Sequence, residues 1–190
     1  MKVISYHVRG LDEFEKRNKV RRLVSEKNPF VLCLQESKLS VVDDLLVTAV
    51  WGNSPSDYSF QPSVGASRGL LTVWDRNLVD VWSTLSFSHV LVIRGRVIST
   101  SQEFVIANVY ASCDTTAKQV LWDHLTSFVL KNGDVNLCLC GDFNSVQSVD
   151  QRKSRGSIFR QHDEDIFIKF IDNIFLVDFL ICGILLTWYR

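Results

Sequence analysis

Hydrophobic and polar positions along the chain predict many short strands separated by a few long helices. Apolar or alternating runs bounded by polar, Gly or Pro residues favour strands. These runs cover residues 3–8, 30–34, 58–61, 70–74, 79–85, 90–97, 104–110 and 136–140. Residues 99–102 separate two of the runs, so we expect a hairpin connection there.

Three segments have the apolar spacing of an amphipathic helix. They are residues 14–26, 115–130 and 163–174. In the first, Asp12 precedes Glu15 by three residues, which predicts a capping box, and Pro29 favours an end just before it. The strands between residues 58 and 110 have no helices between them, which favours an α+β arrangement over an open Rossmann-type sheet. We therefore predict a four-layer α/β sandwich of two mainly antiparallel sheets flanked by helices.

Composition is that of an ordinary globular protein. The 190 residues fit one domain, and 46% of them are hydrophobic, enough to bury a sizeable core. Lys and Arg together number 21, as do Asp and Glu, so the formal net charge is zero. Proteins that bind DNA without sequence preference normally carry a basic excess. Any contact with nucleic acid must therefore come from a local patch.

Neither terminus suggests export or a membrane anchor. The first residues lack the long apolar run of a signal peptide. The apolar segment 174–188 is interrupted by Asp178 and is shorter than the roughly 20 residues that span a bilayer. The five cysteines contain no C-x-x-C pair, so we interpret them as buried thiols rather than zinc ligands. An intracellular protein is expected.

Two acidic residues follow apolar strands and are candidates for catalysis. Glu36 comes after residues 30–34, and Asp142 comes after residues 136–140. Mg²⁺ takes only one or two protein carboxylates and keeps several waters, so this pair could hold one ion. An acid could also orient or deprotonate an attacking water. The alternative is that each acid only caps a strand or a following helix, and spacing alone leaves both interpretations open.

Four short motifs occur in the order and approximate spacing of a known family. They are S-Y-H-V-R-G-L at 5–11, L-Q-E-S-K at 34–38, N-V-Y-A at 108–111 and C-G-D-F-N at 140–144. Together they resemble the endonuclease/exonuclease/phosphatase family. W-G-N-S-P at 51–55, P-S-V-G-A-S at 62–67, G-L-L-T at 69–72 and T-W at 187–188 look like its plant non-LTR retroelement branch. In that branch the domain precedes a reverse transcriptase in one polyprotein.

The resemblance implies a role for each matching residue. Glu36 would bind Mg²⁺ (or Mn²⁺), and Asp142 would position or deprotonate the attacking water. Asn144 would orient phosphate or water, and Tyr110 would contact the scissile phosphate. The alternative for Tyr110 is packing, which is the commoner role of an aromatic residue at a strand end. Thr187, in the T-W element, would lie near the bound strand. Apart from the resemblance, Arg152 and Arg155 are candidates for contacts with DNA phosphates because they follow the G-D-F-N loop, and Arg9 is a further candidate for substrate binding.

Two departures from the family pattern suggest impaired activity. His7 stands where the family usually has Asn, which supports the metal-binding acid by hydrogen bonds. A histidine can also donate, but it is larger and can be cationic, so it could disturb the metal. The chain also ends at Arg190, before the family's terminal Ser-Asp-His element, and is expected to be truncated. His89 and His162 are predicted to be exposed loop residues rather than substitutes for the missing histidine.

The predicted function is that of a magnesium-dependent endonuclease that nicks DNA as part of a retroelement polyprotein, acting in the nucleus. This copy is expected to be weak or inactive, with no small-molecule cofactor and an undetermined oligomeric state. One alternative is a non-catalytic remnant that binds nucleic acid. Another is a decayed retroelement fragment without a function.

Overall fold

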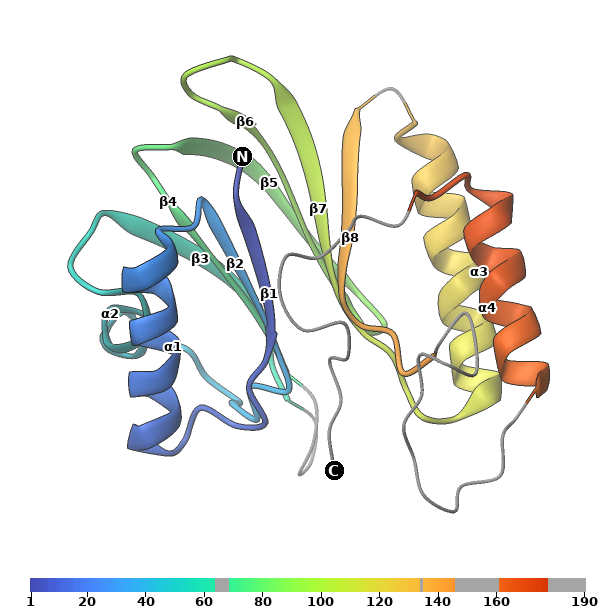
Figure 1. The fold of residues 1–190 in the computed structure, drawn as a ribbon, viewed down its shortest axis with the longest axis horizontal. Coiled ribbons are helices and arrows are strands. Elements are labelled where there is room, and N and C mark those ends of the chain that lie inside the picture. The colour runs from blue at the N-terminus through green and yellow to red at the C-terminus, as the bar shows by residue number, and fades with distance from the viewer. Residues whose placement is uncertain (64–68, 134, 146–160, 178–190) are drawn as a thin grey trace. The chain divides into compact units, whose positions relative to one another are not determined.

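The computed structural model describes residues 1–63, 69–133, 135–145 and 161–177. Contacts divide the chain into two compact units, Met1–Tyr110 with Asp134–Asp142, and Ala111–Gly133 with Phe143–Arg190. The expectation of a single domain stays a prediction. The described helices and strands, labelled in Figure 1, are β1 Val3–His7, α1 Phe14–Lys27, β2 Val31–Gln35, α2 Asp44–Trp51, β3 Ser56–Gln61, β4 Leu70–Asp75, β5 Val79–Phe87, β6 Val90–Val97, β7 Glu103–Tyr110, α3 Thr115–Lys131, β8 Asn136–Asp142 and α4 Gln161–Asn173.

The first unit holds two four-stranded sheets. Their strand orders are β1-β2-β4-β3 and β5-β6-β7-β8. One pair in each sheet is parallel, β1 with β2 and β7 with β8, and the other pairs are antiparallel. The mixed α/β class with two mainly antiparallel sheets is therefore confirmed, and the predicted connection at 99–102 joins β6 to β7.

Strand β2 is buried on both faces, which explains its continuous apolar sequence. Leu34 faces a core in which α1 and α2 cover the first sheet, contributing Val20 and Val50. Cys33 faces the opposite core, where it packs with Ile106 of the second sheet. Figure 1 shows both helices on one side of β1–β4, with β5–β8 on the other side. Full burial of such an aliphatic side chain contributes about 1.5–3 kcal/mol, so the two cores account for the sheet–sheet and sheet–helix packing.

The two parallel pairs align the carboxyl ends of four strands. In the first sheet His7 is the register partner of Gln35, the residue before Glu36. In the second sheet Tyr110 is the register partner of Asp142. Parallel neighbours run in the same direction, so residues that end paired strands emerge at the same edge. This register brings the candidate residues of each sheet into adjacent positions.

Helix boundaries show two differences from the sequence prediction. The capping box at the start of α1 is wrong, because the N-cap is Glu13 and its side chain makes no capping hydrogen bond. The helix does end before Pro29, with Asn28 in the left-handed conformation. Helix α2 was not predicted, because residues 45–51 are almost uniformly apolar and show no helical period. Its start is nevertheless marked by Asp43, whose side chain accepts a hydrogen bond from the amide of Leu46.

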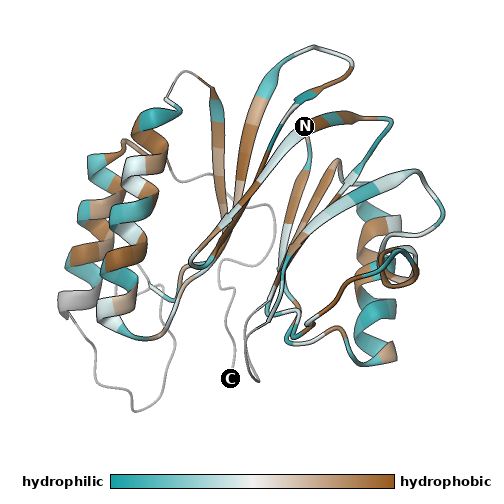
Figure 2. Cartoon of the chain, turned by 180° about the vertical axis from the view of Figure 1, so that it is seen from behind, coloured by the Kyte–Doolittle hydropathy of each residue, from teal (hydrophilic) through white to brown (hydrophobic). Residues whose placement is uncertain are grey.

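The second unit is built on contacts between α3 and α4. The Trp122 ring stacks on Phe170 with centroids 4.9 Å apart and contacts Phe167 at 5.3 Å. Both helices carry hydrophobic and hydrophilic residues, as Figure 2 shows. His162 lies within α4, so its predicted loop position is wrong.

The cysteines are less uniformly buried than predicted. Cys33 is fully buried and Cys138 and Cys140 are half-buried, but Cys113 is exposed. The reason is position: Cys113 follows β7 in a loop, outside any strand. Cys182 falls outside the described residues.

In the part of the chain that the structure describes, no helix is long and apolar enough to cross a membrane.

Gly141, next to Asp142, is required by the close approach of β7 and β8. Its φ is +138°, and an added Cβ would collide with the carbonyl oxygen of Val109. We expect Gly141→Ala to lower the free energy of unfolding by about 2 kcal/mol or more, measured by urea denaturation. Gly133→Ala is the control, since its Cβ would meet nothing closer than 3.9 Å. Equal effects of the two substitutions would contradict the role assigned to this glycine.

Candidate active site

Four candidate residues from both sheets of the first unit meet in one cluster. His7 ends β1 and Glu36 follows β2, whereas Tyr110 ends β7 and Asp142 ends β8. Their side chains are joined by hydrogen bonds in which His7 is the central member. The structure thus brings together two acids that are separated by more than half of the chain.

The imidazole of His7 bridges the two carboxylates. Its Nε2 lies 2.6 Å from Oε2 of Glu36, and its Nδ1 lies 2.7 Å from Oδ2 of Asp142. A neutral imidazole has one N–H and could donate to only one of them, whereas an imidazolium donates from both nitrogens. Two short contacts to carboxylate oxygens therefore fit the protonated ring, with charge-assisted hydrogen bonds on both sides.

The electrostatics of the cluster favour this charged form. Burial opposes a charge on the ring of His7, but the hydrogen bonds and charges of Asp142 and Glu36 outweigh it and raise the pKa of His7 above 6.5. Burial likewise tends to raise the pKa of Glu36. His7 and Lys38 outweigh that effect, so the pKa of Glu36 lies below its ordinary 4.5. The ammonium of Lys38 is 3.3 Å from the second carboxylate oxygen of Glu36.

Tyr110 contacts both His7 and Glu36. Its hydroxyl donates to Oε2 of Glu36 at 3.3 Å, and its ring meets that of His7 edge to face, with centroids 5.4 Å apart. The hydroxyl is therefore at the acidic cluster rather than in the apolar core. This position favours a polar role for Tyr110 over packing alone.

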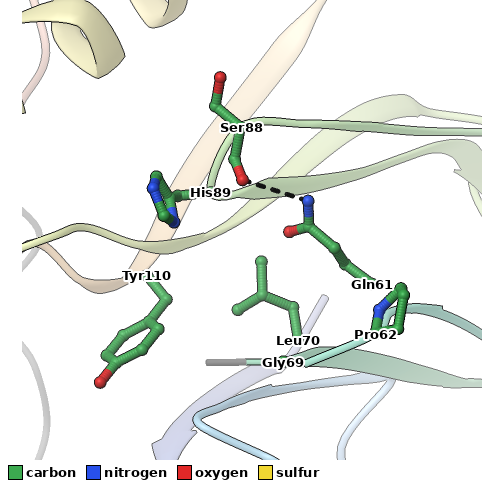
Figure 3. Close-up of a pocket in the computed structure, with 7 residues that line it drawn as sticks. All are labelled: Gln61, Pro62, Gly69, Leu70, Ser88, His89 and Tyr110. Carbon is green, nitrogen blue, oxygen red and sulfur yellow. Dashed lines mark hydrogen bonds between the residues drawn. The ribbon is translucent and has the colours of Figure 1, made fainter. Parts of the chain in front are cut away.

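A small cavity lies beside Tyr110. It has a volume of about 60 Å³ and is lined in part by Gln61, Leu70 and His89 (Figure 3). Gln61 spans one side by donating a hydrogen bond to the carbonyl oxygen of Ser88 at 3.2 Å. His89 lies in the turn between β5 and β6 and is half-buried, so its predicted exposure is wrong. The carbonyl oxygen of His89 accepts a hydrogen bond from the amide of Tyr110 at 3.0 Å, which holds the turn next to the end of β7.

Backbone strain concentrates around Glu36. Glu36, Lys38 and Arg9 all have φ values between +55° and +60°, where side chains other than glycine are uncommon. The strained segments are fastened by backbone hydrogen bonds, such as the one from the amide of Gly10 to the carbonyl oxygen of Glu36 at 2.7 Å. Strain of this kind costs about 1–3 kcal/mol per residue and tends to occur at functional sites.

Asn144 lies in the second unit, where polar contacts hold its segment. Its side-chain amide donates to the carbonyl oxygen of Ala111 at 2.7 Å. Lys118 on α3, only 2% exposed, donates to the carbonyl oxygen of Asn144 and to the hydroxyl of Ser145. Lys118 was not singled out from the sequence, although it occupies a position on the same helix face as Trp122, where an apolar residue is the rule.

The structure does not test the predicted substrate-binding residues. Arg9 is exposed in the segment between β1 and α1, and its carbonyl oxygen accepts a hydrogen bond from Lys16. Arg152, Arg155 and Thr187 fall outside the described residues. All four assignments stay predictions.

Comparison with known proteins identifies the family. A model of the endonuclease/exonuclease/phosphatase family matches residues 6–188. The chain belongs to this family. No protein with a curated functional description matches it at a significant level.

Solved structures with the fold of this family resemble the chain over most of its length. An AP endonuclease from Leishmania major is 18% identical with a TM-score of 0.66, covering 91% of this chain and 66% of that one. An AP endonuclease from Archaeoglobus fulgidus is 15% identical with the same TM-score, covering 90% and 70%. The human Nocturnin catalytic domain with a bound sulfate anion is 15% identical with a TM-score of 0.58, covering 76% and 64%. The chain thus spans slightly less than two thirds of the Leishmania and human chains.

The donors for a divalent cation are present, but they are already engaged. Among the described residues, no group of three or more His, Cys, Asp or Glu side chains is arranged to hold a metal. Mg²⁺ needs only one or two carboxylates, however, because waters and substrate phosphates complete its shell. Glu36 and Asp142 are chemically suitable, and each carboxylate retains lone pairs beyond those facing His7. The donor set therefore fits Mg²⁺ if the imidazole gives way.

The His7 bridge should make the stability of the metal-free protein depend on pH. The raised pKa of His7 stabilises the fold below pH 6.5 and ceases to do so as pH rises through the raised value. The lowered pKa of Glu36 stabilises the fold above pH 4.5 and ceases to do so as pH falls through the lowered value. We therefore expect the parent to exceed His7→Gln in free energy of unfolding by the largest amount between pH 4.5 and pH 6.5. The measurement is urea unfolding in the presence of a chelator. An advantage that does not vary with pH would contradict the ion-paired bridge.

Proposed function

We propose that this chain is a divalent-metal-dependent phosphodiesterase that nicks DNA. The observation that carries the proposal is the convergence of Glu36, Asp142 and the Tyr110 hydroxyl at the carboxyl ends of strands from two sheets. The family to which the chain belongs includes nucleases in its description, and two of the similar structures are AP endonucleases. Both points support hydrolysis of a phosphodiester in DNA.

Each residue has a role that follows from its chemistry. Glu36 would hold Mg²⁺ or Mn²⁺, and the bound cation would supply charge neutralisation at the phosphate. Asp142 orients the attacking water and accepts its proton. Tyr110 donates its hydroxyl proton in a hydrogen bond to a phosphate oxygen, where negative charge increases in the transition state. Asn144 orients phosphate or water, as the family resemblance implies.

His7 should weaken this activity. Its imidazolium places positive charge between the two carboxylates that the cation needs. A cation can bind only by competing with hydrogen bonds of 2.6 and 2.7 Å and by overcoming like-charge repulsion. We therefore propose that the chain binds divalent metals weakly and cleaves slowly.

The cellular setting is proposed from the sequence motifs. The W-G-N-S-P and T-W segments support an origin in a non-LTR retroelement. In that setting the nick supplies a primer for a downstream reverse transcriptase, and the domain acts in the nucleus. The remaining DNA contacts are proposed for Arg9, Arg152, Arg155 and Thr187.

A non-catalytic nucleic-acid-binding remnant is the second candidate. The His7 bridge favours it, because the imidazolium neutralises part of the acidic charge without a metal. Two ammonium groups add positive charge near this cluster. That of Lys16 donates to the carbonyl oxygen of Arg9, and that of Lys38 pairs with the carboxylate of Glu36. This candidate requires DNA binding that weakens steeply with salt and no cleavage under any metal condition.

The nicking assay tests the enzymatic proposal directly. We expect conversion of supercoiled plasmid to open circles with Mg²⁺ or Mn²⁺, slow for the parent and faster for His7→Asn. In the His7→Asn background, Glu36→Gln should reduce the rate by about 10²-fold or more, because a charged metal ligand is lost. Glu103→Gln is the matched control, since this exposed glutamate pairs with Arg94 on the second sheet and lies outside the cluster. Loss of nicking in both variants, or in neither, would refute the assignment of Glu36.

Metal affinity tests the proposed effect of His7 separately. Replacing the imidazolium by a neutral amide removes a positive charge from the site, which should tighten Mn²⁺ binding by about tenfold or more. Isothermal titration calorimetry on the parent and His7→Asn measures this at a pH of about 6, where the ring is charged. Equal Mn²⁺ affinities would show that His7 does not compete with the metal.

A further inference from the structure

Two buried side-chain amides connect the two sheets of the first unit. Gln35, the last residue of β2, is 1% exposed, and Asn108, on β7, is fully buried. The amide nitrogen of Gln35 donates to the amide oxygen of Asn108 at 2.7 Å. Because β2 and β7 belong to different sheets, this hydrogen bond crosses the interface between them.

Further hydrogen bonds from the same two amides reach three strands of the first sheet. Asn108 donates to the carbonyl oxygens of Leu34 and Leu71 at 3.3 Å and to the hydroxyl of Thr72 at 3.2 Å. Gln35 donates in addition to the hydroxyl of Ser5 at 3.1 Å. One side chain of the second sheet is thus tied to β2 and β4, and through Gln35 to β1.

In the buried core between the sheets, these bonds have a directionality that apolar packing lacks. The rest of this core is formed mainly by apolar groups such as Trp74, Ile93 and Phe104. Burial of apolar surface is non-directional, so it holds the sheets together without fixing their relative register. A buried amide that loses its partner costs about 1–3 kcal/mol, so a sliding displacement that breaks the pair is penalised.

The pair lies directly behind the candidate active site. Gln35 precedes Glu36 in the chain, and Asn108 is two residues before Tyr110. The 3.3 Å contact of the Tyr110 hydroxyl with Glu36 crosses between the sheets, as does the 2.7 Å contact of His7 with Asp142. A displacement of one sheet along the other would lengthen both contacts.

We propose that Gln35 and Asn108 are positioning residues that set the distance between Glu36 on the first sheet and Tyr110 and Asp142 on the second. The effect on catalysis rests on the proposed nuclease function, whereas the effect on geometry does not. A misplacement of about 1 Å in a catalytic group can cost about 10²-fold in rate.

If Gln35 and Asn108 only stabilise the fold, a variant that lacks both amides but still folds should keep the geometry of the site. Replacing both partners of a buried polar pair by apolar groups of similar shape is often nearly neutral for stability. The double substitution Gln35→Leu with Asn108→Leu removes the hydrogen bond between the two amides. Because both amides are replaced, neither is left buried without the other. Thr72→Val is the matched control, because it removes one buried acceptor of Asn108 but retains the Gln35–Asn108 bond.

The first experiment measures geometry without relying on activity. Short hydrogen bonds from imidazolium to carboxylates give N–H proton resonances far downfield, and those of His7 report both contacts at a fixed pH of about 6. In the double variant we expect the resonance of the Nδ1–H···Asp142 bond to move upfield or vanish, with a cooperative urea transition retained. Thr72→Val should leave it in place. An unchanged resonance in the folded double variant would overturn the proposal.

The second experiment measures the effect on turnover, using the His7→Asn background. We expect kcat for plasmid nicking to fall by about tenfold or more in the double variant, with KM changed little, because binding surfaces are untouched. Retained kcat would overturn the catalytic part of the proposal. If no protein in the series nicks DNA, the proposed function fails, while the resonance experiment still decides the positioning role.

If the double variant does not fold, the single substitution Gln35→Met allows the same resonance experiment. Gln35→Met keeps the shape of the side chain and breaks only the bonds made by its amide, leaving the donors of Asn108 satisfied. It should shift the His7–Asp142 resonance in the same direction by a smaller amount. The absence of any shift in folded Gln35→Met would overturn the proposal.

Discussion

Two largely buried carboxylates at one end of the two sheets need a positive charge between them. Glu36 and Asp142 are 16% and 9% exposed, and both face a gap that His7 fills. Without a cation between them, their mutual repulsion would push the strand ends apart. The imidazolium supplies that charge from within the chain, so β1, β2 and β8 can end at the same place without a metal.

That bridge depends on the relation between the two sheets. Each parallel pair fixes positions within its own sheet, His7 beside Gln35 and Tyr110 beside Asp142. Neither pair fixes one sheet against the other. The amide of Asn108 does so from inside the core, where water cannot compete for its hydrogen bonds. The contacts of His7 with Glu36 and Asp142 are thus coupled to a polar contact buried in the core between the sheets.

Much of the fold could be predicted from sequence because periodicity reports burial locally. The strand at 90–97 was predicted with its observed limits, and most others within two residues. Helix α2 was missed because its apolar residues show no helical period. The capping box at Asp12 was wrong because a short motif makes the capping hydrogen bond possible but does not fix where the helix begins. Their places after apolar strands made Glu36 and Asp142 candidates, and only the family resemblance gave them roles. The contact of His7 with both, and the Gln35–Asn108 pair, depend on pairing between distant segments, which one sequence does not specify.

The identity of the residue at position 7 has consequences beyond the site itself. A neutral amide there could donate to Glu36 but would leave the two carboxylates in need of a cation, so folding of the rim and metal binding would support each other. An imidazolium satisfies the same carboxylates internally, and the cation must then be bound at the expense of two charge-assisted hydrogen bonds. The same side chain that makes the metal-free rim stable therefore opposes the metal. At this position, a residue that stabilises the metal-free fold weakens the metal binding that catalysis needs. His7 favours the stability of the fold over metal binding.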